Sequence, residues 1–330
     1  MTDFLPEPDN SGNHGGSTPS YHMSPDEFRR HGYALIDWLA SYMETVGERQ
    51  VMPDVKPGDI AASIPITAPE KPEQFEELIG DLDKVVMPGI THWQSPGWFA
   101  YYPAMTSGPS ILGELVSAGL GVQGMLWETS PAVTEIENRV TDWLVDLLGL
   151  PETWKNKTGP GGGVLQSSAS DATHLVHVVA RERATALQKG RPEFVAYTSV
   201  QAHSSVEKGA HVAGIEHYRG IDVDENLSID PIALQEAITA DRAAGLTPLI
   251  VTSVLGTTGT AAVDPIAEIA KIAKDEGLWH HVDAAYGGSA MICPELRYLQ
   301  EGAELVDSYT FNPHKWMFTN FDCNVLWVSD

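Results

Sequence analysis

The chain has 330 residues, of which 42% are hydrophobic and 20% charged, and its formal net charge at pH 7 is −25. This is a globular composition with enough chain for a large core, and its acidic excess argues against nucleic-acid and anionic-membrane partners, since both need a basic surface. The sequence contains no apolar run of about 18 residues that would predict a membrane span, no N-terminal signal pattern and no CxxC spacing among its 2 cysteines, so we expect a cytoplasmic protein.

The N-terminal part predicts a tail followed by two helices. Residues 1–22 are rich in Gly, Ser, Pro, Asn and Asp, which is typical of disorder. Ser24-Pro25-Asp26-Glu27 has the pattern of a helix capping box, and a helix is predicted from there to about Gly47. A second helix is predicted over 75–86, after a proline-rich extended connector. Because both helices offer an apolar face with little nearby to cover it, we expect residues 23–95 to pack on the main domain or on a second subunit.

Residues 96–330 predict one α/β domain. Helical patterns alternate with short apolar runs rich in β-branched residues, which indicates a mostly parallel sheet. The helices are predicted at 111–120, 132–149, 170–189, 232–244 and 265–276, and the strands at 194–197, 249–254, 279–283 and 324–328. The chain ends at Asp330 directly after a strand pattern, and we interpret the sequence as truncated.

The first candidate for chemistry is Lys315, in the run Asn312-Pro313-His314-Lys315. A lysine beside aromatic residues is usually a surface residue with a packed stem, so the run alone predicts little. Asp283 follows an apolar strand pattern and precedes small residues. In open α/β sheets that end of a strand borders the ligand site, although an aspartate there could equally cap the next segment. Such a carboxylate could hold a protonated pyridine nitrogen.

Three further segments place polar residues after strand patterns or at a helix start. Residues 161–173 run from glycines through Ser167 and Ser168 into a helix, a pattern that fits a phosphate site or a plain loop with a serine cap. Thr257-Thr258 follows the strand at 249–254, and His203 follows the strand at 194–197. Taken together, these segments place hydroxyl groups, His, Asp and Lys around one edge of the sheet. A metal site is not expected, since adjacent strand residues such as His280 and His281 point to opposite faces.

At this point the chain resembles a known family, the group II pyridoxal-phosphate-dependent decarboxylases, and most closely the aromatic-L-amino-acid decarboxylases. The resemblance covers residues from about 23 to 330. It rests on blocks that follow one another in the family's order: 87–96, 99–103, 202–207, 281–286, 312–315 and 321–323. The resemblance implies the fold type I architecture, a mostly parallel seven-stranded sheet, the cofactor pyridoxal 5'-phosphate, an amino-acid substrate and a homodimer over which residues 23–95 wrap.

By the same resemblance, Lys315 forms the imine with the cofactor, Asp283 pairs with the pyridinium and His203 stacks on the ring. Further cofactor contacts are implied for Ser168, Ala169, Ser170, Thr258, Asn312 and His314. The substrate pocket is implied at Trp93, Tyr101, Tyr102, Pro103 and Ala104. The chain departs from the family at Ala104, where Thr or Ser is common. It also stops before the family's mobile loop, which carries a catalytic tyrosine, and before the C-terminal small domain.

Three functions remain open from the sequence. The first is decarboxylation of an aromatic L-amino acid, favoured by the aromatic run from Trp98 to Tyr102 and by the lack of Arg or Lys between residues 91 and 110. The second is oxidative conversion of the same substrates to aldehydes, which depends on the loop residue beyond Asp330. The third is a truncated cofactor-binding protein without turnover.

Overall fold

A computed structural model of the chain describes residues 22–187 and 192–330. The chain forms two compact units, Met1–Trp98 and Phe99–Asp330. All of the predicted tail of residues 1–22 except His22 lies outside the described residues. None of the described helices is long and apolar enough to cross a membrane.

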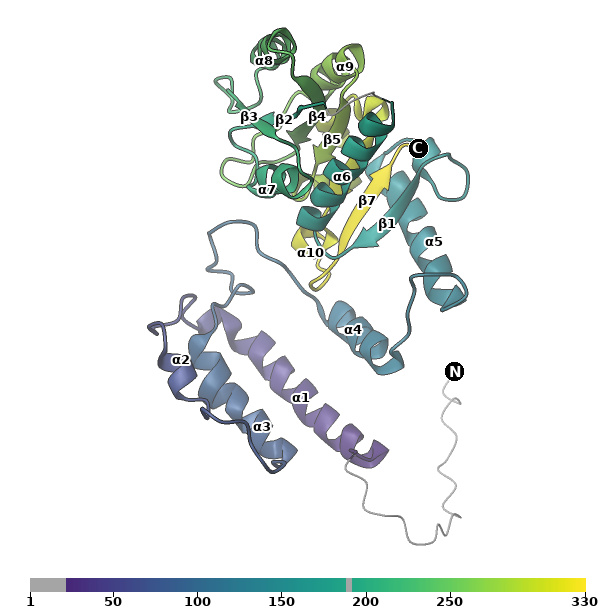
Figure 1. The fold of residues 1–330 in the computed structure, drawn as a ribbon. Coiled ribbons are helices and arrows are strands. Elements are labelled where there is room, and N and C mark those ends of the chain that lie inside the picture. The colour runs from purple at the N-terminus through teal and green to yellow at the C-terminus, as the bar shows by residue number, and fades with distance from the viewer. Residues whose placement is uncertain (1–21, 188–191) are drawn as a thin grey trace. The chain divides into compact units, whose positions relative to one another are not determined.

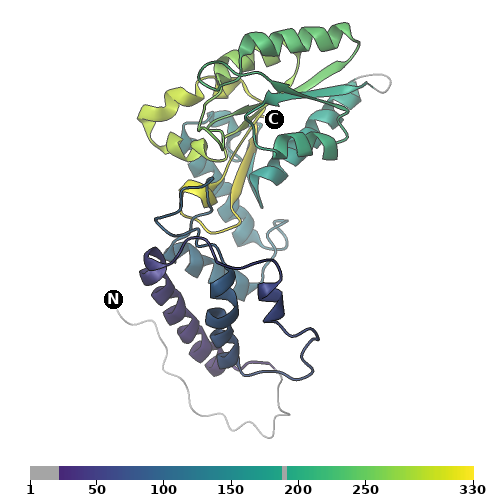
Figure 2. The same ribbon diagram turned by 90° about the vertical axis from the view of Figure 1, so that its left-hand side faces the viewer.

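The first unit is helical (Figure 2). It contains α1 (Pro25–Thr45), α2 (Asp59–Ala62) and α3 (Phe75–Asp81), and a π-helical turn, Leu82–Val86, continues α3. The predicted capping box is present, because the Glu27 N–H donates to Ser24 Oγ (3.3 Å) and the Ser24 N–H donates to Glu27 Oε2 (2.8 Å). The helix α2 interrupts the connector that was predicted to be extended. Its single turn is closed by the Ala62 N–H donating to the Gly58 carbonyl.

The second unit is built on one seven-stranded sheet (Figure 1). The strand order is β1-β7-β6-β5-β4-β2-β3, and β7 runs antiparallel to both of its neighbours while the remaining pairs are parallel. This confirms the predicted mostly parallel seven-stranded α/β fold. The strands are β1 (Gly162–Gln166), β2 (Phe194–Ser199), β3 (His217–Ile221), β4 (Thr247–Val254), β5 (Trp279–Asp283), β6 (Ser308–Phe311) and β7 (Asn324–Val328).

Helices cover both faces of this sheet (Figure 1). On one face, small residues of α6 and α7 pack on β2, β4 and β5. On the other face, α8 and α9 cover β2 and β4. On that second face α5 also packs near β5, β6 and β7. The helices are α4 (Gly108–Leu120), α5 (Pro131–Leu148), α6 (Ala169–Leu187), α7 (Ser205–Val212), α8 (Pro231–Ala243), α9 (Ile266–Glu276) and α10 (Pro313–Trp316). Short 3₁₀ turns lie at Val46–Glu48, Met87–Gly89, Glu152–Trp154, Gly287–Ile292, Pro294–Gln300 and Ala303–Leu305.

The predicted helices and strands of this unit are present with ends shifted by a few residues. Three strands were not predicted, namely β1, β3 and β6, and neither were the helices α7 and α10. The two glycines that open β1 and the mixed polar sequence of β3 hide the usual strand pattern. Because six strands run in one direction, their carboxyl ends meet at a single edge of the sheet.

Candidate active site

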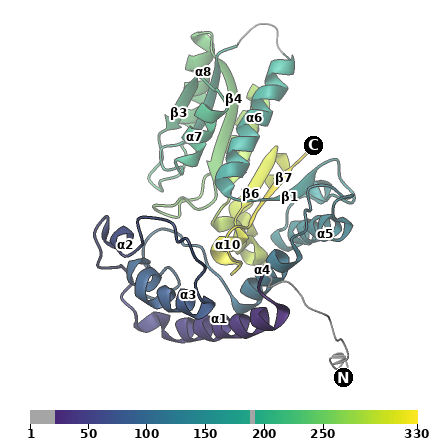
Figure 3. The same ribbon diagram turned by 60° about the horizontal axis from the view of Figure 1, so that its bottom comes forward.

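The site lies at the edge where the parallel strands end. Asp283 is the last residue of β5, and Asn312 to Lys315 follow β6 directly as the short helix α10 (Figure 3). Asn312 and Asp283 are 3% and 5% exposed. The neighbouring strands β5 and β6 therefore bring together Asp283 and Lys315, which lie 32 positions apart in the sequence (315 − 283).

Lys315 and Asp283 influence each other electrostatically. Burial lowers the pKa of Lys315, and the nearby carboxylate of Asp283 opposes this shift without cancelling it. Asp283 Oδ1 also accepts a hydrogen bond from the Ala285 N–H (3.0 Å), which fixes the orientation of the carboxylate. A lysine with a lowered pKa is more often neutral, and the neutral amine is the form that attacks a carbonyl carbon.

The residues before Lys315 are held firmly. Asn324 at the start of β7 donates from Nδ2 to Asn312 Oδ1 (2.8 Å) and to the Phe311 carbonyl (2.9 Å). Since Oδ1 of Asn312 is engaged, its Nδ2 group is the end of the amide that can donate to an anion.

His314 is fixed on both its backbone and its ring. The Met105 N–H donates to the His314 carbonyl (2.7 Å), and the Cys323 N–H donates to His314 Nδ1 (3.0 Å). Burial, with a smaller effect of the Lys315 charge, lowers the pKa of His314 to about 4. The ring is therefore neutral at pH 7. Because Nδ1 accepts, the proton is on Nε2.

The start of α6 supplies groups suited to an anion. Ala169 and Ser170 begin this helix, and the first N–H groups of a helix have no acceptor within it. Ser168 serves as the cap, since its Oγ accepts from the Asp171 N–H (3.1 Å). The Asp171 carboxylate bonds to the Ser167 hydroxyl. Ser168 can still donate its hydroxyl proton, so the serine-cap and phosphate-site interpretations of this segment are compatible.

Two of the glycines that precede the start of α6 lie in a strand and not in a loop. Gly162 and Gly163 lie in strand β1 and pair with Val328 and Trp327 of β7. A Cβ atom on Gly163 would lie 2.4 Å from Nε1 of Trp327 and 2.9 Å from Cβ of Thr141. Gly163 is therefore needed for close packing of β1 under Trp327.

Thr258 and His203 follow the carboxyl ends of β4 and β2, as predicted. Thr258 is exposed beside Thr257, whose Oγ1 accepts from the Ala262 N–H (3.1 Å) and so closes the turn. His203 is exposed, and its Nδ1 accepts from the Ser205 N–H (3.2 Å), which leaves the proton on Nε2 in the neutral ring. An exposed imidazole face is available for stacking against a planar ligand.

The aromatic residues form a stack that sequence reasoning did not identify. Tyr102 lies flat on Tyr286, with ring centroids 3.4 Å apart, and Tyr286 lies flat on Trp316, at 4.8 Å. The Tyr102 hydroxyl donates to the Thr257 carbonyl (3.2 Å). The stack thus joins Tyr102 to the residue after Lys315. The available signal was the position of the two missed residues, since Tyr286 lies three residues after Asp283 and Trp316 lies next to Lys315.

The other predicted pocket residues differ in their burial. Tyr101 is exposed, Pro103 is half-buried and Ala104 is buried. Trp93 belongs to the first unit, where its ring centroid lies 5.4 Å from that of Trp98. The pocket prediction therefore stays a prediction for these four residues.

Together these groups fit pyridoxal phosphate. The cofactor needs an amine for its aldehyde, a carboxylate for its pyridine nitrogen and donors for its phosphate. At the same edge of the sheet, the amine is offered by Lys315 and the carboxylate by Asp283. The donors for the phosphate are offered by the start of α6 and by Asn312. Among the described residues no cluster of His, Cys, Asp and Glu could hold a metal ion.

A family model supports this assignment, since the pyridoxal-dependent decarboxylase conserved domain matches residues 57–330. The chain belongs to this family. The chain is 46% identical to the aromatic-L-amino-acid decarboxylase of Mus musculus over 93% of its own length and 66% of that relative. It is 44% identical to the phenylacetaldehyde synthase of Arabidopsis thaliana over 93% of its own length and 64% of that relative.

A solved structure supports the fold assignment of the chain. The tryptophan decarboxylase of Catharanthus roseus, determined in complex with L-tryptophan, has a TM-score of 0.90 and 39% sequence identity. The match covers 93% of this chain and 67% of that chain. The chain thus spans about two thirds of the length of these relatives.

Proposed function

We propose that this chain carries the cofactor site of an enzyme that decarboxylates an aromatic L-amino acid to its amine and carbon dioxide. The observation that carries the proposal is the pair of Lys315 and Asp283, a lysine of lowered pKa beside a buried carboxylate, at the strand edge where the start of α6 also lies. The similarity to aromatic-L-amino-acid decarboxylases at 46% identity supports the reaction type.

Each residue has a specific task in this proposal. When bound, pyridoxal phosphate supplies a carbon that reacts with amines and a ring that accepts the electron pair left by departing carbon dioxide. Lys315 would provide the neutral amine, and Asp283 would hold the proton on the ring nitrogen. The phosphate would be held by Asn312, Ser168, Ala169 and Ser170, further cofactor contacts would come from Thr258 and His314, and His203 would lie on the ring.

The aromatic residues are proposed to select the substrate. Trp93, Tyr101, Tyr102, Pro103 and Ala104 would surround a flat apolar side chain. The stacked rings of Tyr102, Tyr286 and Trp316 support this, because a rigid aromatic wall favours an aromatic ligand over one with a charged side chain.

The test is a substrate panel with wild type and Lys315→Ala. Protein saturated with pyridoxal phosphate is given tryptophan, tyrosine, dihydroxyphenylalanine or glutamate, and released carbon dioxide and amine are measured. We expect aromatic substrates to be preferred. Lys315→Ala should lose the visible absorbance of lysine-bound cofactor and at least about 1,000-fold in rate, equivalent to about 4 kcal/mol. A preference for glutamate would contradict the substrate assignment.

A second function has its own support. The similarity to the phenylacetaldehyde synthase favours oxidative conversion of the same substrates to aldehydes. In the same panel, aldehyde together with hydrogen peroxide would identify this reaction. If wild type binds the cofactor and forms neither amine nor aldehyde, the chain is a cofactor-binding protein without turnover.

We also propose that the protein is a cytoplasmic homodimer. Helix α4 has no buried residue, and its exposed apolar side chains give a second copy a surface to cover. These side chains are Leu112, Leu115, Val116 and Leu120. Residues 23–95 would wrap over the partner, leaving 96–330 as the cofactor-binding domain. The free thiols of Cys293 and Cys323 are consistent with a reducing compartment. A monomer in sedimentation velocity at micromolar concentration would contradict the dimer.

A further inference from the structure

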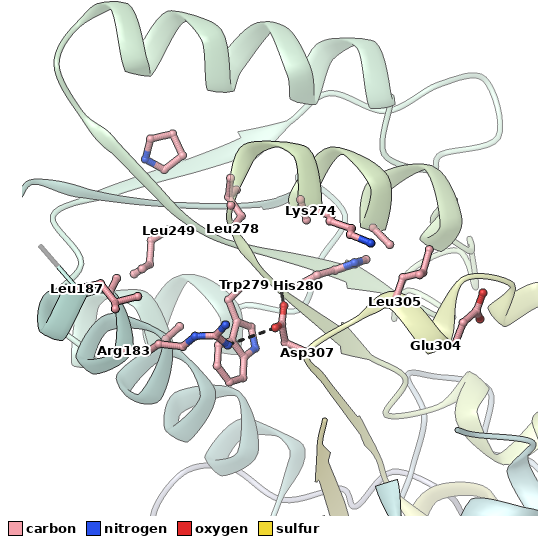
Figure 4. A pocket seen from close by; sticks show the side chains of 16 residues that line it. Arg183, Leu187, Leu249, Lys274, Leu278, Trp279, His280, Glu304, Leu305 and Asp307 are labelled. Atoms are coloured by element: carbon pink, nitrogen blue, oxygen red, sulfur yellow. Dashed lines mark hydrogen bonds and ion pairs between the residues drawn. The ribbon is translucent and has the colours of Figure 1, made fainter. Parts of the chain in front are cut away.

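A cavity of about 500 Å³ lies at the edge of the sheet opposite Lys315 (Figure 4). Its walls come from the starts of β4 and β5 and from the helices α6 and α9. Most of the lining side chains are aliphatic, and they include Leu187, Leu249, Leu278 and Leu305. A space of this size with such walls suits the apolar body of a small molecule.

One group of polar side chains in the cavity is already satisfied. The backbone N–H of His280 donates to Asp307 Oδ2 (2.8 Å), and Arg183 Nη1 lies 3.4 Å from Asp307 Oδ1. The Arg183 guanidinium also lies over the Trp279 ring, 5.4 Å from its centroid. The deepest carboxylate of the cavity is thus paired, and it has little capacity left to attract a cationic ligand.

Two other groups lack partners. The imidazole of His280 is 1% exposed and bonds through Nε2 to Ser253 Oγ (2.8 Å), but its Nδ1 is buried with no hydrogen-bond partner in the described part of the chain. Lys274, on the last turn of α9, forms no ion pair among the described residues. Figure 4 shows the Lys274 side chain and the His280 ring directed into the same part of the cavity, with Glu304 at its margin. A buried unpaired nitrogen carries a cost that a bound ligand can remove.

We propose that this cavity is a binding site for a small monocarboxylate with an apolar body. The carboxylate would accept from the Lys274 ammonium and from His280 Nδ1–H, and the carbon chain would lie against Leu249 and Leu305. A local cation is needed for this because the whole chain carries a net charge of −25 and repels anions. The site is separate from the proposed decarboxylation, and its ligand occupies the beginnings of the strands whose ends carry Asp283 and Lys315.

The experiment measures hexanoate binding by isothermal titration calorimetry to the whole chain saturated with pyridoxal phosphate. Hexanoate has the apolar body and the charge but no amine or aromatic ring. We expect saturable binding at one site per chain. Hexanamide, which has the same shape without charge, should bind about tenfold more weakly, as expected for the loss of one charge-assisted hydrogen bond.

Matched variants locate the site. Lys274→Gln should weaken hexanoate about tenfold, whereas Lys271→Gln, on the same helix but outside the cavity, should change it by less than about twofold. Leu305→Glu places a negative charge on the exposed rim and should abolish binding. Lys315→Ala should leave the Kd unchanged, which separates this cavity from the active site. The proposal is overturned by absence of saturable binding, by equal binding of the amide, by equal Kd values for the two lysine variants, or by loss of binding in Lys315→Ala.

Discussion

The two ends of strand β5 place polar side chains in different surroundings. His280 near its start and Asp283 at its end are both buried. Burial alone lowers the pKa of His280 to about 3, so this imidazole is neutral. Asp283 instead has the Lys315 amine nearby. Burial lowers the pKa of Lys315, and the carboxylate of Asp283 acts against this shift. The same strand thus shows that burial favours the neutral form of His280, whereas the opposite charge of Asp283 works against this effect of burial at Lys315.

The largest expected effect comes from removing the charge at the reactive end. Asp283→Asn should lower kcat about 1,000-fold, or about 4 kcal/mol, because an amide cannot hold the proton on the ring nitrogen and leaves Lys315 without its charged partner. Release of labelled carbon dioxide under single-turnover conditions measures this loss.

Asp264 provides the control, since it is 1% exposed and accepts hydrogen bonds from the Ile229 and Val254 N–H groups. Asp264→Asn should reduce stability while retaining kcat in the folded protein. Equal losses of kcat in both variants would show that Asp283 acts only through the fold.

The next effect concerns stability at the other end of β5. Between pH 4.5 and 6.5 an unfolded histidine binds a proton that folded His280 does not. The free energy of unfolding therefore rises with pH in this window, and the stabilising contribution of the neutral His280 is lost progressively as the pH falls below 6.5. The contribution of His280 over these two pH units is about 2–3 kcal/mol. His280→Gln keeps a group that can bond to Ser253 but does not titrate, so it should make this slope less steep. The buried His177, His281 and His314, whose pKa values are also lowered, maintain the rest of the slope.

Urea unfolding at several pH values measures the slope. His211→Gln is the matched control, because it makes the same substitution at an exposed histidine. If wild type and His280→Gln show the same pH dependence, the folded imidazole titrates as it does in the unfolded chain and the comparison between the two ends of β5 is wrong.

The smallest effect tests whether the aromatic stack strengthens the reactive edge. A double-mutant cycle with Tyr102→Leu and Tyr286→Leu should give a coupling free energy of about 0.5–1.5 kcal/mol in unfolding, since the two rings lie in flat contact. Tyr298→Leu, at an exposed tyrosine, should show no coupling with Tyr102→Leu. A coupling of zero for the first pair would show that the rings stack without mutual stabilisation.

Much of the site could be predicted because its chemistry follows strand ends. Asp283 was found from the apolar run before it, and Lys315 was found from the run Asn312–Lys315 and from the blocks that resemble the family. The parallel order of β5 and β6 places the two residues together. The phosphate segment was predicted only in part. Sequence reasoning placed Ser168 to Ser170 at a helix start, but it could not show that Gly163 is required under Trp327, since that contact joins residues far apart in the chain.

Other features depend on tertiary contacts that no local pattern reports. The stack through Tyr286 and Trp316 requires three segments to meet, and the missing partner of His280 Nδ1 appears only once the surrounding elements are packed. The helix α2 formed where five prolines predicted an extended connector, because the four residues Asp59–Ala62 contain no proline. A helix of a single turn is too short to be recognised from the spacing of residues in the sequence.

The pairing of β1 with β7 has a consequence for how the protein folds. β1 is the first of the seven strands in the sequence but pairs with β7, whose residues are synthesised after those of the other six strands. Asn324 at the start of β7 also fixes Asn312. The cofactor edge cannot be complete until this closure of a long segment of chain has occurred, and contacts between distant residues slow folding. On the ribosome, β1 would therefore wait without its partner while the intervening strands assemble, a period in which an open strand edge is vulnerable to aggregation.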